Sequence, residues 1–240
     1  MNKKKDSQLP ERKPATASEV DAFLQAVATA PARSGDGPGR LLFAMDATAS
    51  RYPSWDRAAR QQGDMFRAAD QLGGIEVQLA FFRGFGEFKV AKWTANAARM
   101  TQLMTTVDCR AGETQIGKVL AHAANETRLS TVHALIYVGD CCEEDVDALG
   151  KLAGELGLLG VPAFMFQEGN DPIAGYAFAE IARLTGGAHC PFDASSAETL
   201  RQLLGAVAVY AAGGQKALES HAKSAGGEAL KITDQMKRAK

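Results

Sequence analysis

The segment Leu41–Ser50 (LLFAMDATAS) places three oxygen-bearing side chains directly after an apolar run. The run does not alternate with polar residues, which is typical of a parallel strand covered by helices on both faces. Asp46, Thr48 and Ser50 follow at two-residue steps, and such positions point to one side of an extended chain. In open α/β sheets, ligands bind outside the carboxyl ends of the strands. Because Mg²⁺ prefers small oxygen ligands, the segment predicts a metal site at the end of a buried strand.

The rest of the chain predicts further strands that alternate with helices. Apolar segments at 75–83, 132–138, 161–167 and 188–192 are expected to be strands, and the alternating segment 88–94 an antiparallel edge strand. Helices are expected at 18–27, with Ser18 as its N-cap, and at 55–72, 96–104, 114–127, 143–158, 171–185 and 197–211. This order predicts an α/β fold with a doubly wound, mostly parallel sheet, one antiparallel edge strand and helices on both faces.

The composition divides the chain into three regions. Residues 1–39 are expected to hold a polar tail, one helix and a Gly/Pro-rich linker, 40–212 the α/β domain, and 213–240 a basic extension. The formal net charge is −1, which gives no general attraction to nucleic acid or to a membrane. Segments 1–13 and 216–240 each carry +3, which leaves −7 on the residues between them. Either the basic ends are solubilising, or the acidic body surrounds a cation site.

Features of the N-terminus and the cysteines predict a cytoplasmic protein. The first residues lack the apolar segment of a secretory signal, and no run approaches the roughly 18 apolar residues of a membrane span. The four cysteines lack zinc-finger spacing, so we expect reduced thiols. They are Cys109, Cys141, Cys142 and Cys190. Cys141 and Cys142 are either buried small side chains or redox-sensitive thiols.

Two further predicted loops carry side chains with oxygen atoms. Thr114 follows a glycine-containing loop and precedes a helix, and Asp140 follows the apolar strand 132–138. Taken singly, each residue has a structural interpretation: Asp46 as a turn residue, Thr114 as an N-cap and Asp140 as another cap. Their joint arrival at strand ends and a helix start, in the chain order of the family motif given next, favours a shared metal site.

These residues resemble the von Willebrand factor type A (VWA) family over about 40–212. The metal-ion-dependent adhesion site (MIDAS) of that family reads D-x-S-x-S, then a Thr, then an Asp. The resemblance implies a Rossmann-like VWA fold and a shell for Mg²⁺ or Mn²⁺ made by Asp46, Thr48, Ser50, Thr114 and Asp140. This chain departs from the pattern at Thr48, where Ser is usual, and at Cys141, where Gly commonly follows the last Asp.

The resemblance also implies a binding role. The ion would keep an exchangeable position that a carboxylate of a protein partner completes, so the chain is expected to be an intracellular adaptor and not an enzyme. His122 and His133 are expected in the core or at the surface, not as ligands. In relatives that switch conformation, changes at the metal loops are coupled to the closing helix, here 197–211. Neither a nucleic-acid partner nor a membrane span is expected.

Three alternatives compete with this interpretation. A haloacid-dehalogenase-like phosphatase also begins with a strand-end Asp, but needs an acid where Thr48 stands. The segment 112–118 (GETQIGK) nearly matches a P-loop, as in an Mg²⁺-dependent NTPase, but Val119 lacks the hydroxyl that Mg²⁺ needs. A third alternative is a scaffold that has lost its metal and works through surface contacts.

Overall fold

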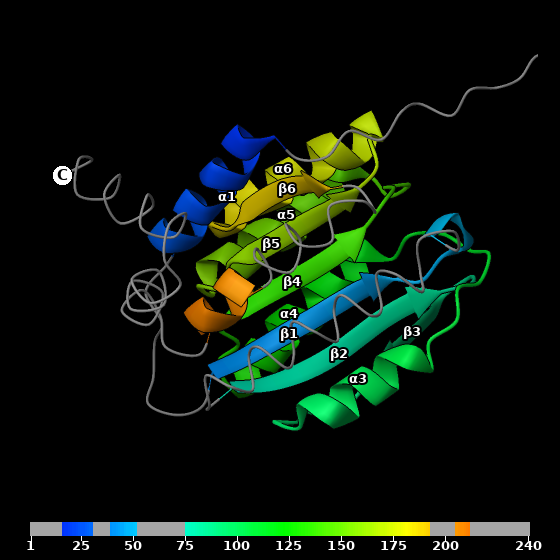
Figure 1. The fold of residues 1–240 in the computed structure, drawn as a ribbon. Helices are drawn as coiled ribbons and strands as arrows, with labels where there is room; N and C mark the ends of the chain where they lie inside the picture. The colour runs from blue at the N-terminus through cyan, green and yellow to red at the C-terminus, as the bar shows by residue number, and fades with distance from the viewer. Residues whose placement is uncertain (1–15, 31–38, 52–74, 193–204, 212–240) are drawn as a thin grey trace, which may run out of the picture.

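A single sheet forms the centre of the computed structural model, which describes residues 16–30, 39–51, 75–192 and 205–211 (Figure 1). Within these residues the sheet has six strands in the order β3-β2-β1-β4-β5-β6. The strands are β1 (Gly39–Asp46), β2 (Ile75–Arg83), β3 (Glu87–Val90), β4 (Ala134–Gly139), β5 (Ala163–Glu168) and β6 (Ala188–Phe192). All neighbours are parallel except β2 and β3. The predicted fold class is confirmed.

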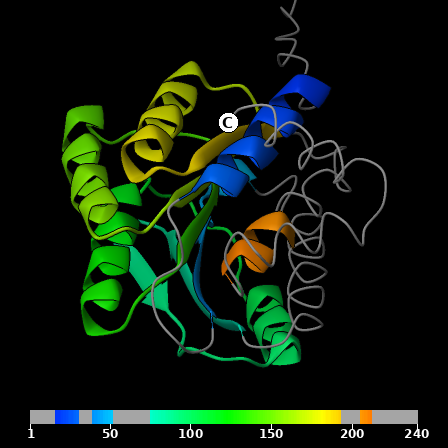
Figure 2. The ribbon, with the colours of Figure 1, turned by 90° about the vertical axis from the view of Figure 1, so that its left-hand side faces the viewer.

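Helices cover both faces of the sheet, as Figure 2 shows edge-on. One face carries α1 (Ala17–Thr29), α3 (Ala97–Thr105) and the helical residues 205–211, and the other carries α4 (Ile116–Leu129), α5 (Val146–Leu158) and α6 (Pro172–Thr185). Alternate side chains of β1 enter the two cores: Phe43 lies in the first and Leu42 in the second. This explains why the strand is apolar at every position. No helix of the described ranges is long and apolar enough to cross a membrane.

Several predictions fall on residues that the structure does not describe. These are the tail before residue 16, the linker, the helix at 55–72, the first part of the closing helix and the C-terminal extension. The part of the closing helix at 205–211 is helical and buried against the first face of the sheet. The predicted domain boundaries remain predictions.

The first helix packs onto the sheet. Its buried Phe23 lies with its ring centroid 5.9 Å from that of Phe164 and 5.0 Å from that of Phe166 on β5. The predicted N-cap, Ser18, is wrong. Thr16 caps the helix instead: its hydroxyl accepts from the Glu19 N–H, and the Glu19 carboxylate accepts from the Thr16 N–H. This reciprocal capping box satisfies two backbone donors, whereas a cap at Ser18 would begin the helix two residues later.

Two other boundaries also differ from the prediction. The edge strand β3 ends at Val90, and Thr94 pairs with Val77 only through an isolated bridge. Helix α5 begins at Val146 behind its N-cap Asp145, so Glu143 and Glu144 belong to the loop after β4 and not to the helix.

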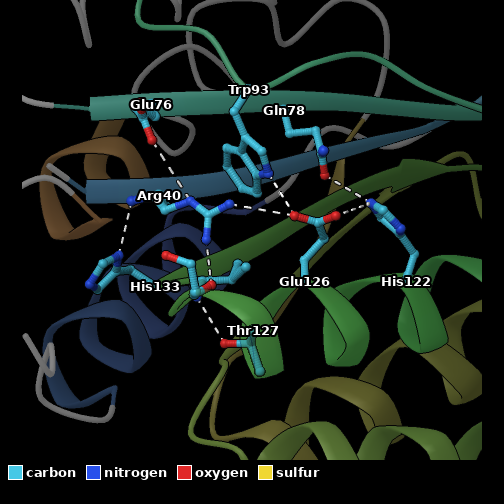
Figure 3. Close-up of polar contacts among 10 residues, drawn as sticks. Arg40, Glu76, Gln78, Trp93, His122, Glu126, Thr127 and His133 are labelled. Carbon is cyan, nitrogen blue, oxygen red and sulfur yellow. Dashed lines mark hydrogen bonds and ion pairs between the residues drawn. The ribbon is translucent and has the colours of Figure 1, made fainter.

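A polar cluster joins α4 to the amino-terminal end of the sheet (Figure 3). The Arg40 guanidinium lies 3.9 Å from the centroid of the Trp93 ring. The Glu126 carboxylate, at 19% exposure, accepts from Trp93 Nε1 at 2.7 Å and pairs with Arg40 Nη2 at 3.4 Å. His122, one helical turn earlier on α4, pairs through Nε2 with Gln78 Oε1 at 2.8 Å. The cluster lies at the end of the sheet opposite the predicted metal site.

We predict that Glu126→Ala lowers the free energy of unfolding by about 1–3 kcal/mol, because it leaves the half-buried donors of Trp93 and Arg40 without this acceptor. Urea unfolding followed by circular dichroism measures the change. The matched control is Glu155→Ala, which removes a carboxylate from an exposed pair with Arg128 and should have little effect. Equal losses in the two variants would show that the cluster adds nothing to stability.

Candidate metal site at the carboxyl end of the sheet

The predicted site lies where the direction of the strand order reverses. Asp46 is the last residue of β1, and Asp140 directly follows β4, the parallel neighbour of β1. From β1 the chain continues to β2 and β3 on one side of the sheet, while β4, β5 and β6 lie on the other. In open α/β sheets this switch point is where the loops diverge and leave a crevice for a ligand.

The turn after β1 brings the hydroxyls of the motif to Asp140. Asp46 Oδ1 accepts from the Thr48 N–H at 2.7 Å, and the Thr48 carbonyl accepts from the Arg51 N–H at 3.2 Å, at the end of the short helix η1 (Ala49–Arg51). The Thr48 and Ser50 hydroxyl oxygens consequently lie 3.0 Å apart, and Ser50 Oγ donates to Asp140 Oδ1 at 3.1 Å. The structure thus links four of the five predicted residues directly.

Thr114, the fifth predicted residue, reaches this edge through Glu143. Its N–H donates to Glu143 Oε2 and its hydroxyl accepts from the Glu143 N–H, both at 3.0 Å. These bonds tie the loop before α4 to the loop that carries Asp140. The loop before α4 also packs closely against the β2–β3 turn: a Cβ on Gly112 would lie 2.1 Å from the Gly84 carbonyl oxygen. Only a glycine permits this approach.

A carboxylate from the neighbouring loop caps α4, so the interpretation of Thr114 as its N-cap is wrong. The helix begins at Ile116, and the Glu144 carboxylate accepts from the Ile116 N–H and, at 2.9 Å, from the Gly117 N–H. A P-loop would need these N–H groups for phosphate. Lys118 Nζ, the counterpart of the P-loop lysine, instead donates to the Gly86 carbonyl and to Gln115 Oε1. The structure therefore argues against nucleotide binding at 112–118.

Asp46 supplies the observation that points most directly to a cation. Its side chain is fully buried, and its Oδ2 has no hydrogen-bond partner in the part of the chain that the structure describes. Burial raises the pKa of Asp46 to about 6; the charge of Asp140 adds to this rise, while Thr48 and Arg51 oppose it. A buried carboxylate oxygen without a donor is costly unless a cation meets it. The oxygen-rich set around Asp46 therefore fits a hard divalent ion.

Beside these residues lies a buried ion pair that the sequence analysis did not find. Arg51 Nε is 3.2 Å from Glu168 Oε2, and Arg51 Nη1 donates to the carbonyl oxygens of Asp46 at 2.8 Å and Val138 at 3.5 Å. The position of Arg51 directly after Ser50 was visible in the sequence. Glu168 lies 117 positions further along, and no local pattern connects the two.

Cys141 is a second residue that the sequence analysis did not assign to the site. Single ligand atoms of Asp46, Asp140 and Cys141 all lie within 4.8 Å of one another. Burial raises the pKa of the Cys141 thiol well above its usual range, and the negative charges of Asp140 and Asp46 add to this rise. All four cysteines of the chain are free thiols in the structure. The sequence signal for a role of Cys141 in the site is its position directly after Asp140.

The histidines named in the sequence analysis lie away from this edge. His122 belongs to the polar cluster on α4. His133 Nδ1 accepts from the Arg40 N–H at 2.9 Å, near the amino-terminal end of the sheet. Both side chains therefore have hydrogen bonds away from the carboxyl end of the sheet.

Comparisons with known proteins identify the fold. No family model matches the sequence, and no curated protein shows a significant match. Among solved structures, the chain is similar to a von Willebrand factor type A protein from Catenulispora acidiphila, with 16% identity and a TM-score of 0.59 over 72% of this chain and 43% of that one. It is also similar to the SpRpn10 VWA domain, with 12% identity and a TM-score of 0.54 over 71% of this chain and 93% of that one.

A third similar structure is an aerotolerance-related membrane protein from Bacteroides fragilis, with 15% identity and a TM-score of 0.52 over 69% of this chain and 98% of that one. The chain therefore has the VWA fold. At these identities the likeness concerns the fold alone, and the chain spans less than half of the Catenulispora protein.

We predict that Arg51→Met lowers the free energy of unfolding by about 3–5 kcal/mol, because it removes the cation opposite the buried Glu168 carboxylate. The double variant Arg51→Met/Glu168→Leu should lose less than the single variant, since it removes both charges. Thermal and urea unfolding measure both. The exposed pair of Arg183 and Glu180 provides the control, and Arg183→Met should have little effect. A double variant that is less stable than Arg51→Met would contradict this explanation.

Proposed function

We propose that this chain is a VWA-type binding module that holds Mg²⁺ or Mn²⁺ at the carboxyl end of its sheet and uses it to bind an acidic residue of a protein partner. The observation that carries the proposal is the buried Asp46 carboxylate: its Oδ2 has no described partner, and one of its oxygens lies within 4.8 Å of a carboxylate oxygen of Asp140. The VWA fold supports it, because the sequence resemblance to the MIDAS motif falls on the loops that the fold brings together.

The ligands of the ion would be the predicted set, and their chemistry suits a hard cation. They are Asp46, Thr48, Ser50, Thr114 and Asp140. Mg²⁺ takes about six oxygen ligands and gives up water reluctantly. Two carboxylates and three neutral hydroxyls leave room in that shell for water or for a carboxylate of a partner. Ser50 and Asp140 are accessible to solvent, so a partner can approach the ion from that side.

The polar groups around the site favour binding over hydrolysis. The Thr48 hydroxyl, which stands where a phosphatase would need an acid, lies in hydrogen-bond contact with Ser50. The nearby carboxylates of Glu143 and Glu144 accept from backbone N–H groups at the start of α4. None of these groups is placed as a general acid or base. We therefore propose a role without catalysis. A cytoplasmic location is also proposed, because all four cysteines are free thiols.

An exposed aromatic side chain beside the site suits a protein partner. Phe85, in the turn between β2 and β3, is 82% exposed. Its neighbour Gly84 contacts the loop that leads to Thr114. A partner that places a carboxylate on the ion could cover this ring, and burying an aromatic ring contributes strongly to interfaces. The net charge of −7 on the residues between the two basic ends gives no attraction to nucleic acid, so the proposal includes no nucleic-acid partner.

We predict that chelator-treated protein binds one Mg²⁺ or Mn²⁺, measured by isothermal titration calorimetry, and that Asp46→Asn loses this binding. The substitution keeps the volume of the side chain but removes its charge. Asp147→Asn, at an exposed position in the first turn of α5, is the matched control and should bind the ion as the wild type does. Unchanged affinity in Asp46→Asn would refute the metal assignment.

We further predict that capture of partner proteins by the immobilised chain requires the ion. Binding should be lost in EDTA, restored by Mg²⁺, and absent in Asp46→Asn under all conditions. A quantitative pull-down from cells that express the protein measures it. A scaffold that works through surface contacts alone would capture the same proteins in EDTA, and this result would contradict the proposed role of the ion.

A further inference from the structure

Cys141 gives the candidate metal site a ligand that the oxygen motif lacks. Its thiol lies with the carboxylates of Asp46 and Asp140 in one group whose ligand atoms are within 4.8 Å of one another. The group contains the buried Asp46, whose Oδ2 has no described partner. The group therefore offers two carboxylates, one of them buried with an unsatisfied oxygen, and one thiol, which is a mixed oxygen and sulfur ligand set.

The geometry allows this set to close on an ion. Zn²⁺ binds carboxylate oxygen at about 2.1 Å and thiolate sulfur at about 2.3 Å, so tetrahedral ligands lie about 3.6 Å apart. Because the ligand atoms of Asp46, Asp140 and Cys141 lie within 4.8 Å of one another, binding of the ion would shorten these distances by up to about 1 Å. Asp46 is held in place by burial and by the Thr48 N–H, whereas Asp140 and Cys141 are partly exposed and can rotate toward it.

A thiolate ligand changes which ions the site prefers to bind. Thiolate is a soft ligand that selects Zn²⁺ and related transition ions, while Mg²⁺ prefers an all-oxygen shell. Three protein ligands with a fourth, open position are typical of zinc sites that exchange a ligand. A partner carboxylate could take that position, as in the proposed function.

We propose that Asp46, Asp140 and Cys141 form a binding site for Zn²⁺ or a related transition ion, with Cys141 bound as thiolate and one position open to an exogenous carboxylate. This inference rests on the proposed function for the place of the ion and names the ion class that the site selects. Cys142 is excluded from the ligand set, because its side chain is buried in the core beneath α4 and α5 and its Sγ contacts the Glu144 carbonyl.

The test uses Co²⁺ as a spectroscopic substitute for Zn²⁺ in the full, chelator-treated chain kept under reducing conditions. One equivalent of Co²⁺ should produce the near-ultraviolet charge-transfer band of a thiolate bound to Co²⁺, and Zn²⁺ should abolish it by displacement. Cys141→Ser should lose the band and bind Zn²⁺ at least about tenfold more weakly, an effect that even outer-shell substitutions reach. The control Cys142→Ala should keep the band.

The outcomes separate this inference from the proposed function. Calorimetric binding of Mg²⁺ or Mn²⁺ together with Co²⁺ binding that gives no charge-transfer band would overturn the role of Cys141 and leave the proposed function standing. A band that persists in Cys141→Ser would also overturn it. A Cys141-dependent band in a chain that binds neither Mg²⁺ nor Mn²⁺ would support the inference and contradict the choice of ion in the proposed function.

Discussion

The buried guanidinium of Arg51 holds the carboxyl ends of three strands together. It donates to the backbone carbonyls of Asp46 on β1 and Val138 on β4, and it faces the carboxylate of Glu168 at the end of β5. Burying such a pair gains little net stability, because desolvation offsets the attraction, but removing one partner is costly. The pair therefore acts mainly as a geometric constraint, which fixes the turn after β1 relative to the loop after β4.

The geometry of the candidate site depends on the Arg51–Glu168 pair and on the carboxylate of Glu144. The Arg51 side chain holds the Asp46 carbonyl, directly before the turn that carries Thr48 and Ser50, and Glu144 fixes the loop after Asp140 against the start of α4. In both cases a charged side chain satisfies backbone groups that the ends of strands and helices leave open. The candidate ligands around Asp46 are thus held by neighbours outside the candidate set, which is the arrangement that would keep a binding site in place before an ion binds.

Local patterns predicted most of the fold, and contacts between distant residues account for the parts of the site that they missed. Apolar runs that directly follow a pair of glycines predicted β2 and β6 with the observed bounds, and the order of elements predicted the sheet class. The capping box of Thr16 and Glu19 is a local pattern, because the two residues stand three positions apart, so the sequence contained the signal for this cap. The capping of α4 by Glu144 and the pairing of Arg51 with Glu168 join residues 27 to 117 positions apart. Periodicity carries no information about such pairs. The motif placed Asp46, Thr48, Ser50 and Asp140 at one edge, where the structure links them.

The most direct test of the metal site is a crystal structure of the full chain grown with Mn²⁺, with data collected for anomalous scattering. A single anomalous peak between the side chains of Asp46, Ser50 and Asp140 is the predicted result, with the bond from Ser50 to Asp140 replaced by contacts to the ion. A map without a peak there, in which Ser50 still donates to Asp140, would contradict the metal assignment. It would show that these residues form a hydrogen-bonded turn without a metal ion.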